Sequence, residues 1–191
     1  MPRSLLTLED LSGKEILALI QRAGEIKYQI KGSKRYPSLL KNKVIGLLFE
    51  KPSTRTRASF EAAILRLGGG SIYLPSSELQ SKRGEPIRDT ARMLGGYLDA
   101  LVARVFSHRS VEEFRRYAGI PVVNGLSDQA HPTQIICDLF TIWEHKGRLK
   151  GIRLAYIGDG NNVCHSLLLG AAMTGMNMIA ACPPGYAPDP E

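Results

Sequence analysis

Short apolar segments alternate with segments of helical periodicity along this chain, and this alternation limits the folds open to it. The apolar segments that predict strands are 44–49, 71–74, 100–106 and 120–124. Between them, apolar residues recur every three or four positions, which predicts helices. Strands that alternate with helices form a parallel sheet covered on both faces. The sequence therefore predicts an α/β fold, with a four-stranded parallel sheet flanked by helices.

Several predicted helices begin with recognisable signals. Ser12-Gly13-Lys14-Glu15 is a capping-box pattern, and Ser110-Val111-Glu112-Glu113 is expected to cap a later helix that ends near residue 119. Pro86 suits the first turn of a helix ending near residue 95, and Pro132 the first turn of one ending near residue 146. These signals set the expected order of elements.

A second unit is predicted to begin after residue 147. Segments 152–157 and 176–182 predict strands, 158–162 a turn and 163–174 a helix. A sheet this small is marginal by itself. We therefore expect a first domain over residues 1–147 and the start of a second α/β domain over 148–191, incomplete at its C-terminus.

The segment FEKPSTRTRASFE, residues 49–61, joins the first predicted strand to a helix. Ser53, Thr54, Arg55 and Thr56 lie at the helix N-terminus, where free N–H groups and the helix dipole favour an anion. Arginine can bind a phosphate through two parallel hydrogen bonds. The alternative is an ordinary Ser/Thr cap with solvated arginines, but the grouping of hydroxyls and guanidinium favours an anion site.

Three further polar residues are expected at the same edge of the sheet, because ligands of parallel sheets bind beyond the strands' carboxyl ends. Arg104 lies near the end of the third strand, and His131 and Gln134 follow the fourth. A buried arginine needs a partner, which a bound anion would supply. His131 could instead be a structural helix-entry residue. The set as a whole predicts donors that stabilise developing charge on a carbonyl.

Composition excludes several other classes of protein. The formal net charge of +7 comes from scattered residues, so no nucleic-acid-binding face is predicted. Cys137, Cys164 and Cys182 have no metal or disulfide spacing and are expected to pack as small hydrophobes. No signal peptide or membrane span is predicted, which favours a cytoplasmic protein without membrane partners. No metal or organic cofactor is implied.

Three segments together resemble the aspartate/ornithine carbamoyltransferase family, most of all its ornithine-specific members: 49–57, His131-Pro132-Thr133-Gln134 and Gly158-Asp159-Gly160-Asn161-Asn162. The resemblance covers nearly the whole chain. It implies that the phosphate of carbamoyl phosphate is held by Ser53, Thr54, Arg55 and Thr56, and that its carbamoyl and bridging groups contact Arg104, His131 and Gln134. It also implies that Gln80 reaches carbamoyl phosphate and that Asn162 contacts L-ornithine, although Asn162 could simply cap the following helix.

The resemblance further implies a reaction of arginine metabolism, which serves arginine biosynthesis in some members of the family and catabolism in others. The δ-amine of ornithine attacks carbamoyl phosphate through a tetrahedral intermediate, giving citrulline and phosphate, with Arg55, Arg104 and His131 as catalytic residues. A homotrimer or a multiple of trimers is implied. The family's later ornithine-binding segments do not occur in this sequence, so the chain alone is expected to be inactive. Aspartate, putrescine or acetylated ornithine as acceptor, and a non-catalytic carbamoyl phosphate-binding fragment, remain alternatives.

A nicotinamide-dependent enzyme is a rival of a different class. The segment 158–163 follows a predicted strand and imitates the start of a dinucleotide fingerprint. However, the third glycine is missing, and no acidic residue lies about twenty residues further on, where the chain reads Ala180-Ala181-Cys182-Pro183-Pro184. The sequence therefore disfavours this reading.

Overall fold

The computed structural model describes residues 3–33, 35–78 and 84–189. The element order is a short 3-10 helix η1 (Leu8–Asp10), then α1 (Gly13–Ser33), β1 (Val44–Phe49), α2 (Thr54–Arg66), β2 (Gly70–Pro75), α3 (Ile87–Gly95), β3 (Ala100–Arg104), α4 (His108–Tyr117), β4 (Val122–Leu126), α5 (Pro132–Lys146), β5 (Arg153–Ile157), α6 (Asn162–Thr174) and β6 (Asn177–Ala181). Strands and helices alternate as the sequence predicted.

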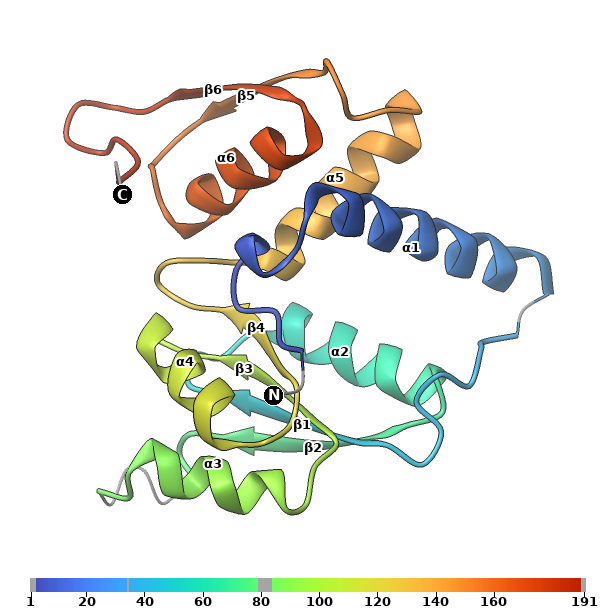
Figure 1. Ribbon diagram of the computed structural model, residues 1–191, viewed down its shortest axis with the longest axis vertical. Helices are drawn as coiled ribbons and strands as arrows, with labels where there is room; N and C mark the ends of the chain where they lie inside the picture. Colours follow the sequence, from blue (N-terminus) through green and yellow to red (C-terminus); the bar gives the residue numbers. More distant parts are fainter. Residues whose placement is uncertain (1–2, 34, 79–83, 190–191) are drawn as a thin grey trace.

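The first four strands form one parallel sheet in the order β2-β1-β3-β4. Helices α3 and α4 cover one face, where Leu48, Leu101 and Phe114 belong to one buried cluster. Helix α2 covers the other face, where Ile64 packs with Leu47 and Val102 (Figure 1). The predicted α/β fold with helices on both faces is confirmed.

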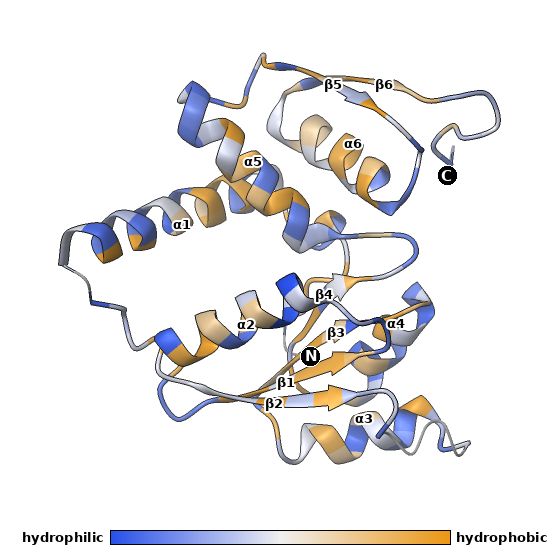
Figure 2. Ribbon diagram, turned by 180° about the vertical axis from the view of Figure 1, so that it is seen from behind, coloured by the Kyte–Doolittle hydropathy of each residue, from blue (hydrophilic) through white to orange (hydrophobic). Residues whose placement is uncertain are grey.

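A further hydrophobic cluster lies between the first helix and the last two helices. Helix α1 packs against α5, and α5 against α6, around Ile16, Ile20, Ile135, Leu139 and Leu167. Strands β5 and β6 form a separate two-stranded parallel sheet beside α6. Figure 2 shows hydrophobic residues in both α5 and α6, and the two helices pack against each other. These contacts place the first residues of α6 beside the loop that follows β4.

Two predicted strand boundaries were wrong, and both differences lie beside the candidate site. Strand β3 ends at Arg104, because the N–H of Phe106 donates to the side chain of Glu50 over 2.7 Å and leaves the ladder. Strand β4 is displaced toward the C-terminus, to Val122–Leu126, because Gly125 forms a bulge opposite the step from Ala103 to Arg104. The bulge lets β4 continue past Asn124.

The expected cap of α4 at Ser110 was also wrong. The helix begins at His108, and its preceding residue Ser107 makes no side-chain capping bond. Instead, the carboxylate of Asp128 accepts the N–H of His108 over 2.7 Å, so the cap comes from a loop twenty residues away. By contrast, the box at Ser12 and Glu15 is confirmed, since each side chain accepts the other residue's N–H.

Candidate active site at the carboxyl edge of the sheet

The N-terminus of α2 forms the floor of the site. Ser53 is the residue before the helix, and its hydroxyl accepts the N–H of Thr56 over 3.4 Å. The same hydroxyl contacts Oγ1 of Thr56 at 2.9 Å. The apolar strand β1 brings this turn to the carboxyl edge, where the hydrophilic end of α2 is visible in Figure 2. The turn therefore presents hydroxyls and a helix N-terminus to one cleft.

That cleft has a volume of about 660 Å³ and opens between α2, β3 and α5. Its polar lining collects six of the residues that the sequence proposed, namely Ser53, Arg55, Thr56, Arg104, His131 and Gln134. They come from three separate segments, which the parallel sheet brings to one edge. Their contacts with carbamoyl phosphate stay a prediction.

Two other proposed residues lie outside this cleft, and a third is not among the described residues. Thr54 lines a neighbouring hollow of about 430 Å³, together with Arg57 and Tyr73. Asn162 donates from Nδ2 to the carbonyl of Ser127 over 2.6 Å and is not among the cleft-lining residues. Gln80 lies outside the described residues.

The helix α6 is capped by Asn161, so the reading of Asn162 as the cap was wrong. Oδ1 of Asn161 accepts the N–H groups of Val163 and Cys164 over 3.0 and 3.2 Å. The side chain of Asn162 is thereby left for contacts outside its own helix, and it contacts the loop after β4.

Arg104 stands at the last position of β3, at the bulge in β4. Within the described part of the chain, its Nε is buried without a hydrogen-bond partner. Burial lowers the pKa of its guanidinium below the usual value. A buried donor of this kind is costly unless something accepts from it. Its position in the cleft points to an anion or a carbonyl oxygen as that acceptor.

His131 closes the opposite side of the cleft. It precedes α5 in a non-helical conformation (φ −137°, ψ 65°), and its Nδ1 lies 3.5 Å from Oγ1 of Thr133. Burial, followed by the positive charge of Arg104, lowers the pKa of His131 to about 4. The imidazole is therefore neutral near pH 7, where a ring N–H can donate to a carbonyl oxygen.

The low pKa of His131 predicts an acid-dependent loss of stability. Above the usual pKa of 6.5 the imidazole is neutral in both the folded and the unfolded chain. Between 6.5 and about 4 the unfolded chain binds a proton that the folded chain does not, so the free energy of unfolding decreases as the pH falls. His131→Gln should decrease less over this range. Urea unfolding from pH 7 to 4 measures the difference, and parallel curves for the two proteins would contradict the prediction.

Glu50 and Lys51 were not predicted as site residues, yet their contacts connect two loops of the site. The N–H of Glu50 donates to the carbonyl of Arg104, and its carboxylate accepts the N–H of Phe106. Nζ of Lys51 lies 4.6 Å from the centre of the Phe106 ring. These contacts connect the turn that carries Ser53 to the strand end that carries Arg104. No sequence pattern predicts these contacts, because the residues that make them are more than fifty positions apart in the chain.

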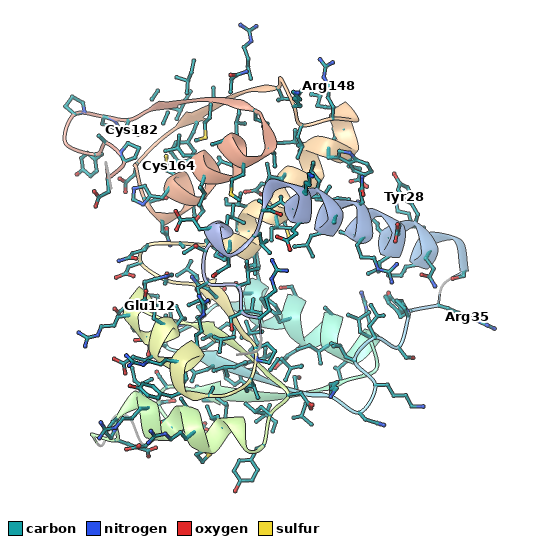
Figure 3. All side chains as sticks on the ribbon, in the orientation of Figure 1. Tyr28, Arg35, Glu112, Arg148, Cys164 and Cys182 are labelled. Carbon is teal, nitrogen blue, oxygen red and sulfur yellow. The ribbon has the colours of Figure 1, made fainter. Side chains whose placement is uncertain are left out.

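Cys137 also lines the cleft and is exposed, so its predicted packing as a small hydrophobe was wrong. It follows Gln134 by three positions on α5, which puts both on one helical face. That spacing could have predicted Cys137 as a cleft-lining residue. The pKa of its thiol is raised, first by partial burial and then by the charge of Asp138, so the thiol form is favoured. Cys164 is buried in α6, as expected, and Cys182 lies half-buried after β6 (Figure 3).

A buried polar network shapes the loop between β4 and His131. Asn124 is fully buried, and its Nδ2 donates to the carbonyls of Leu6 and Ala130. Its Oδ1 accepts the N–H of Leu126 over 3.0 Å. Oγ of Ser127 accepts the N–H of Ala130. The loop is therefore held from inside the fold.

The described residues contain no group of three or more His, Cys, Asp or Glu side chains placed to hold a metal ion. Among those same residues, no helix is both long and apolar enough to cross a membrane. The turn at 158–162 is covered by the end of the chain, since the N–H of Gly160 donates to Tyr186 and its Cα faces the backbone of Pro188. This packing disfavours a dinucleotide at that turn.

Comparison with known proteins agrees with this fold. The family model described as "Aspartate/ornithine carbamoyltransferase, carbamoyl-P binding domain" matches residues 3–144, and the corresponding Asp/Orn binding domain matches 150–191. The chain belongs to the aspartate/ornithine carbamoyltransferase family.

Curated relatives named ornithine carbamoyltransferase include one from Pyrococcus horikoshii, which is 48% identical over 187 residues and is matched over 98% of this chain and 59% of its own length. The one from Methanosarcina mazei is 50% identical over 191 residues, with 100% and 63% covered. The solved structure of ornithine carbamoyltransferase from Pyrococcus furiosus superposes with a TM-score of 0.95 at 48% identity, with 98% and 59% covered. The chain thus spans 59% to 63% of the length of these relatives.

Proposed function

We propose that this chain takes part in carbamoyl transfer from carbamoyl phosphate to the δ-amine of L-ornithine, which gives citrulline and phosphate for arginine biosynthesis. The observation that carries the proposal is the cleft itself. It combines a helix N-terminus, the exposed Arg55, the unpartnered Nε of Arg104 and the neutral imidazole of His131. An anionic phosphate beside a polarised carbonyl suits this set of donors.

In the proposed mechanism, the phosphate lies at the N-terminus of α2, where Ser53, Thr56 and Arg55 donate to it. Arg104 and His131 donate to the carbamoyl oxygen and stabilise the negative charge that develops on it. The neutral δ-amine forms a bond to the carbamoyl carbon as the electron pair of the C=O bond moves onto the carbamoyl oxygen, and the amine proton passes to a phosphate oxygen. The bond from this carbon to the bridging oxygen then breaks, and phosphate leaves with the charge of Arg55 beside it.

Ornithine is proposed as acceptor because the relatives described above carry that name. The contact of Asn162 with ornithine, a boundary between residues 147 and 148, a homotrimeric assembly and a cytoplasmic location are further parts of the proposal. The gap between the two family matches, 3–144 and 150–191, supports the boundary. Aspartate or putrescine as acceptor, and a fragment that binds carbamoyl phosphate without turnover, are the alternatives. We expect the 191-residue chain to bind carbamoyl phosphate weakly and not to turn over.

The phosphate site can be tested with two arginines of the same helical turn. Phosphonoacetamide, in which a methylene group replaces the labile bridging oxygen of carbamoyl phosphate, is titrated calorimetrically. Arg55→Ala should weaken binding by about tenfold or more, since charge-assisted hydrogen bonds contribute ~1.5–3 kcal/mol. Arg57→Ala is the matched control, because Arg57 pairs with Glu61 and stacks on Tyr73.

The Arg57→Ala substitution removes the same charge from the same helix as Arg55→Ala. An unspecific electrostatic effect would therefore weaken ligand binding equally in both variants. That result, or wild-type affinity in Arg55→Ala, would contradict the assignment of Arg55 to the phosphate.

A further inference from the structure

The loop of residues 127–131, which carries His131, is held at both ends by helix α6. At one end, Nδ2 of Asn162 donates to the carbonyl of Ser127 over 2.6 Å. At the other end, the backbone N–H of His131 donates to Oγ of Ser166 over 2.9 Å. Each bond joins residues that are 35 positions apart in the sequence. The location of His131 therefore depends on α6 as well as on its own strand.

The hydroxyl of Ser166 is buried, and it both donates and accepts a hydrogen bond. Its residue is only 5% exposed. Oγ accepts from His131 and donates to the carbonyl of Asn162 over 2.9 Å. One hydroxyl thus connects the residue proposed to polarise the carbamoyl group with the residue proposed to contact ornithine. Because Ser166 is not among the cleft-lining residues, any effect on the site must pass through these two neighbours.

We propose that Ser166 is a positioning residue that holds His131 against the carbamoyl phosphate cleft and couples its position to the first turn of α6. This inference rests on the proposed function of the cleft. It assigns to the second unit an indirect part in forming a site whose lining donors all come from the first four strands and their helices.

The backbone geometry gives the reason. His131 lies just before α5 with φ −137° and ψ 65°, outside the helical region, and its side chain makes no capping bond. Its N–H is part-buried and needs an acceptor, which comes from Ser166 across the interface. Without that acceptor the loop is expected to relax toward one that can satisfy the N–H. A shift of about 1 Å in a catalytic donor is enough to reduce its effect strongly.

Helix α6 contains a matched control for this hydroxyl. Thr174 is also buried, and its Oγ1 donates to the carbonyl four residues earlier, Gly170, over 2.7 Å. Ser166 makes the same kind of bond to Asn162. The two residues differ in that Ser166 also accepts from the loop. Thr174→Val therefore removes a buried helical hydroxyl without touching the loop.

The test compares Ser166→Ala, Ser166→Cys and Thr174→Val with the wild-type chain. Cysteine keeps the approximate size of serine but is a weak acceptor, so it still tests the bond if the alanine variant does not fold. Affinity for phosphonoacetamide is measured by calorimetry. The pKa of the His131 imidazole is measured by NMR, with His131→Gln used to assign its signal among the four histidines.

We expect both Ser166 variants to bind phosphonoacetamide about tenfold more weakly, the factor typical of losing one buried hydrogen bond. The pKa of His131 should rise from about 4 toward 6.5 as the ring leaves its buried position. Thr174→Val should change neither quantity. Unchanged affinity in the Ser166 variants, or equal losses in Thr174→Val, would overturn the proposal.

Failure of the proposed function gives a different result. If the wild-type chain itself does not bind phosphonoacetamide, the proposed site is wrong for this chain. The NMR titration then decides the positioning role alone. A pKa of His131 that stays near 4 in both Ser166 variants overturns that role as well.

Discussion

Arg104→Met is expected to weaken binding of phosphonoacetamide by up to about a hundredfold, because it removes a charge-assisted hydrogen bond to the carbamoyl oxygen, and such bonds contribute ~1.5–3 kcal/mol. Nε of Arg104 is buried and finds no acceptor among the described residues, and the guanidinium faces the cleft with Arg55 and His131. If a complete carbamoyltransferase that contains this chain is assayed, the loss of one such donor costs ~2.7–4 kcal/mol of transition-state stabilisation, so turnover should fall by roughly a hundredfold or more.

The same substitution should raise the free energy of unfolding. In the folded chain Nε of the guanidinium is buried without an acceptor among the described residues, and methionine fills similar space with no polar group to satisfy. Lower affinity combined with higher stability is the signature of a residue kept for binding. Arg109→Met is the control, since the side chain of Arg109 is 84% exposed and pairs with Glu113.

Calorimetry and urea unfolding measure the two quantities. Wild-type affinity in Arg104→Met would remove Arg104 from the site. A fall in stability would show that its guanidinium has a partner in the free protein.

Asn124→Leu is expected to lower the free energy of unfolding by at least about 3 kcal/mol, because an unsatisfied buried polar group costs ~1–3 kcal/mol and two are created. The carbonyl of Leu6 would lose its donor and the N–H of Leu126 its acceptor, whereas the carbonyl of Ala130 would keep its bonds from Ser127. The side chain is fully buried, so water cannot easily replace it. This network joins the N-terminal segment to the loop that carries His131.

Asn177→Leu provides the comparison, since Asn177 is exposed on β6 and such substitutions usually change stability by less than about 0.5 kcal/mol. Urea unfolding of both variants measures the difference. A change below about 1 kcal/mol in Asn124→Leu would mean that the loop repairs its hydrogen bonds by another route.

The site joins two parts of the chain that are far apart in sequence. Most donors come from the first sheet and its helices, while Asn162 and Ser166 on α6 hold the loop of His131. Movement of α6 would therefore be transmitted to the candidate carbonyl donor through two hydrogen bonds. Ligand binding at the start of α6 and at the cleft would then influence each other.

The parallel α/β fold and most of the candidate cleft could be predicted from the sequence. Strand and helix periodicities are local properties, and a parallel sheet necessarily brings the carboxyl ends of its strands to one edge. The grouping of Ser53, Arg55, Arg104 and His131 followed from that rule. The anion site at residues 53–56 was readable because its donors are consecutive in the chain.

The burial and the hydrogen-bond partners of these residues could not be predicted and became known from the tertiary structure. The burial of Arg104 Nε, the low pKa of His131 and the exposure of Cys137 depend on neighbours from other elements. The same holds for the hydrogen bonds of Asn162 and Ser166 with the loop of residues 127–131, which join residues 35 positions apart. Periodicity and capping patterns report on a few adjacent turns, whereas desolvation and long-range hydrogen bonds arise only when distant segments pack together.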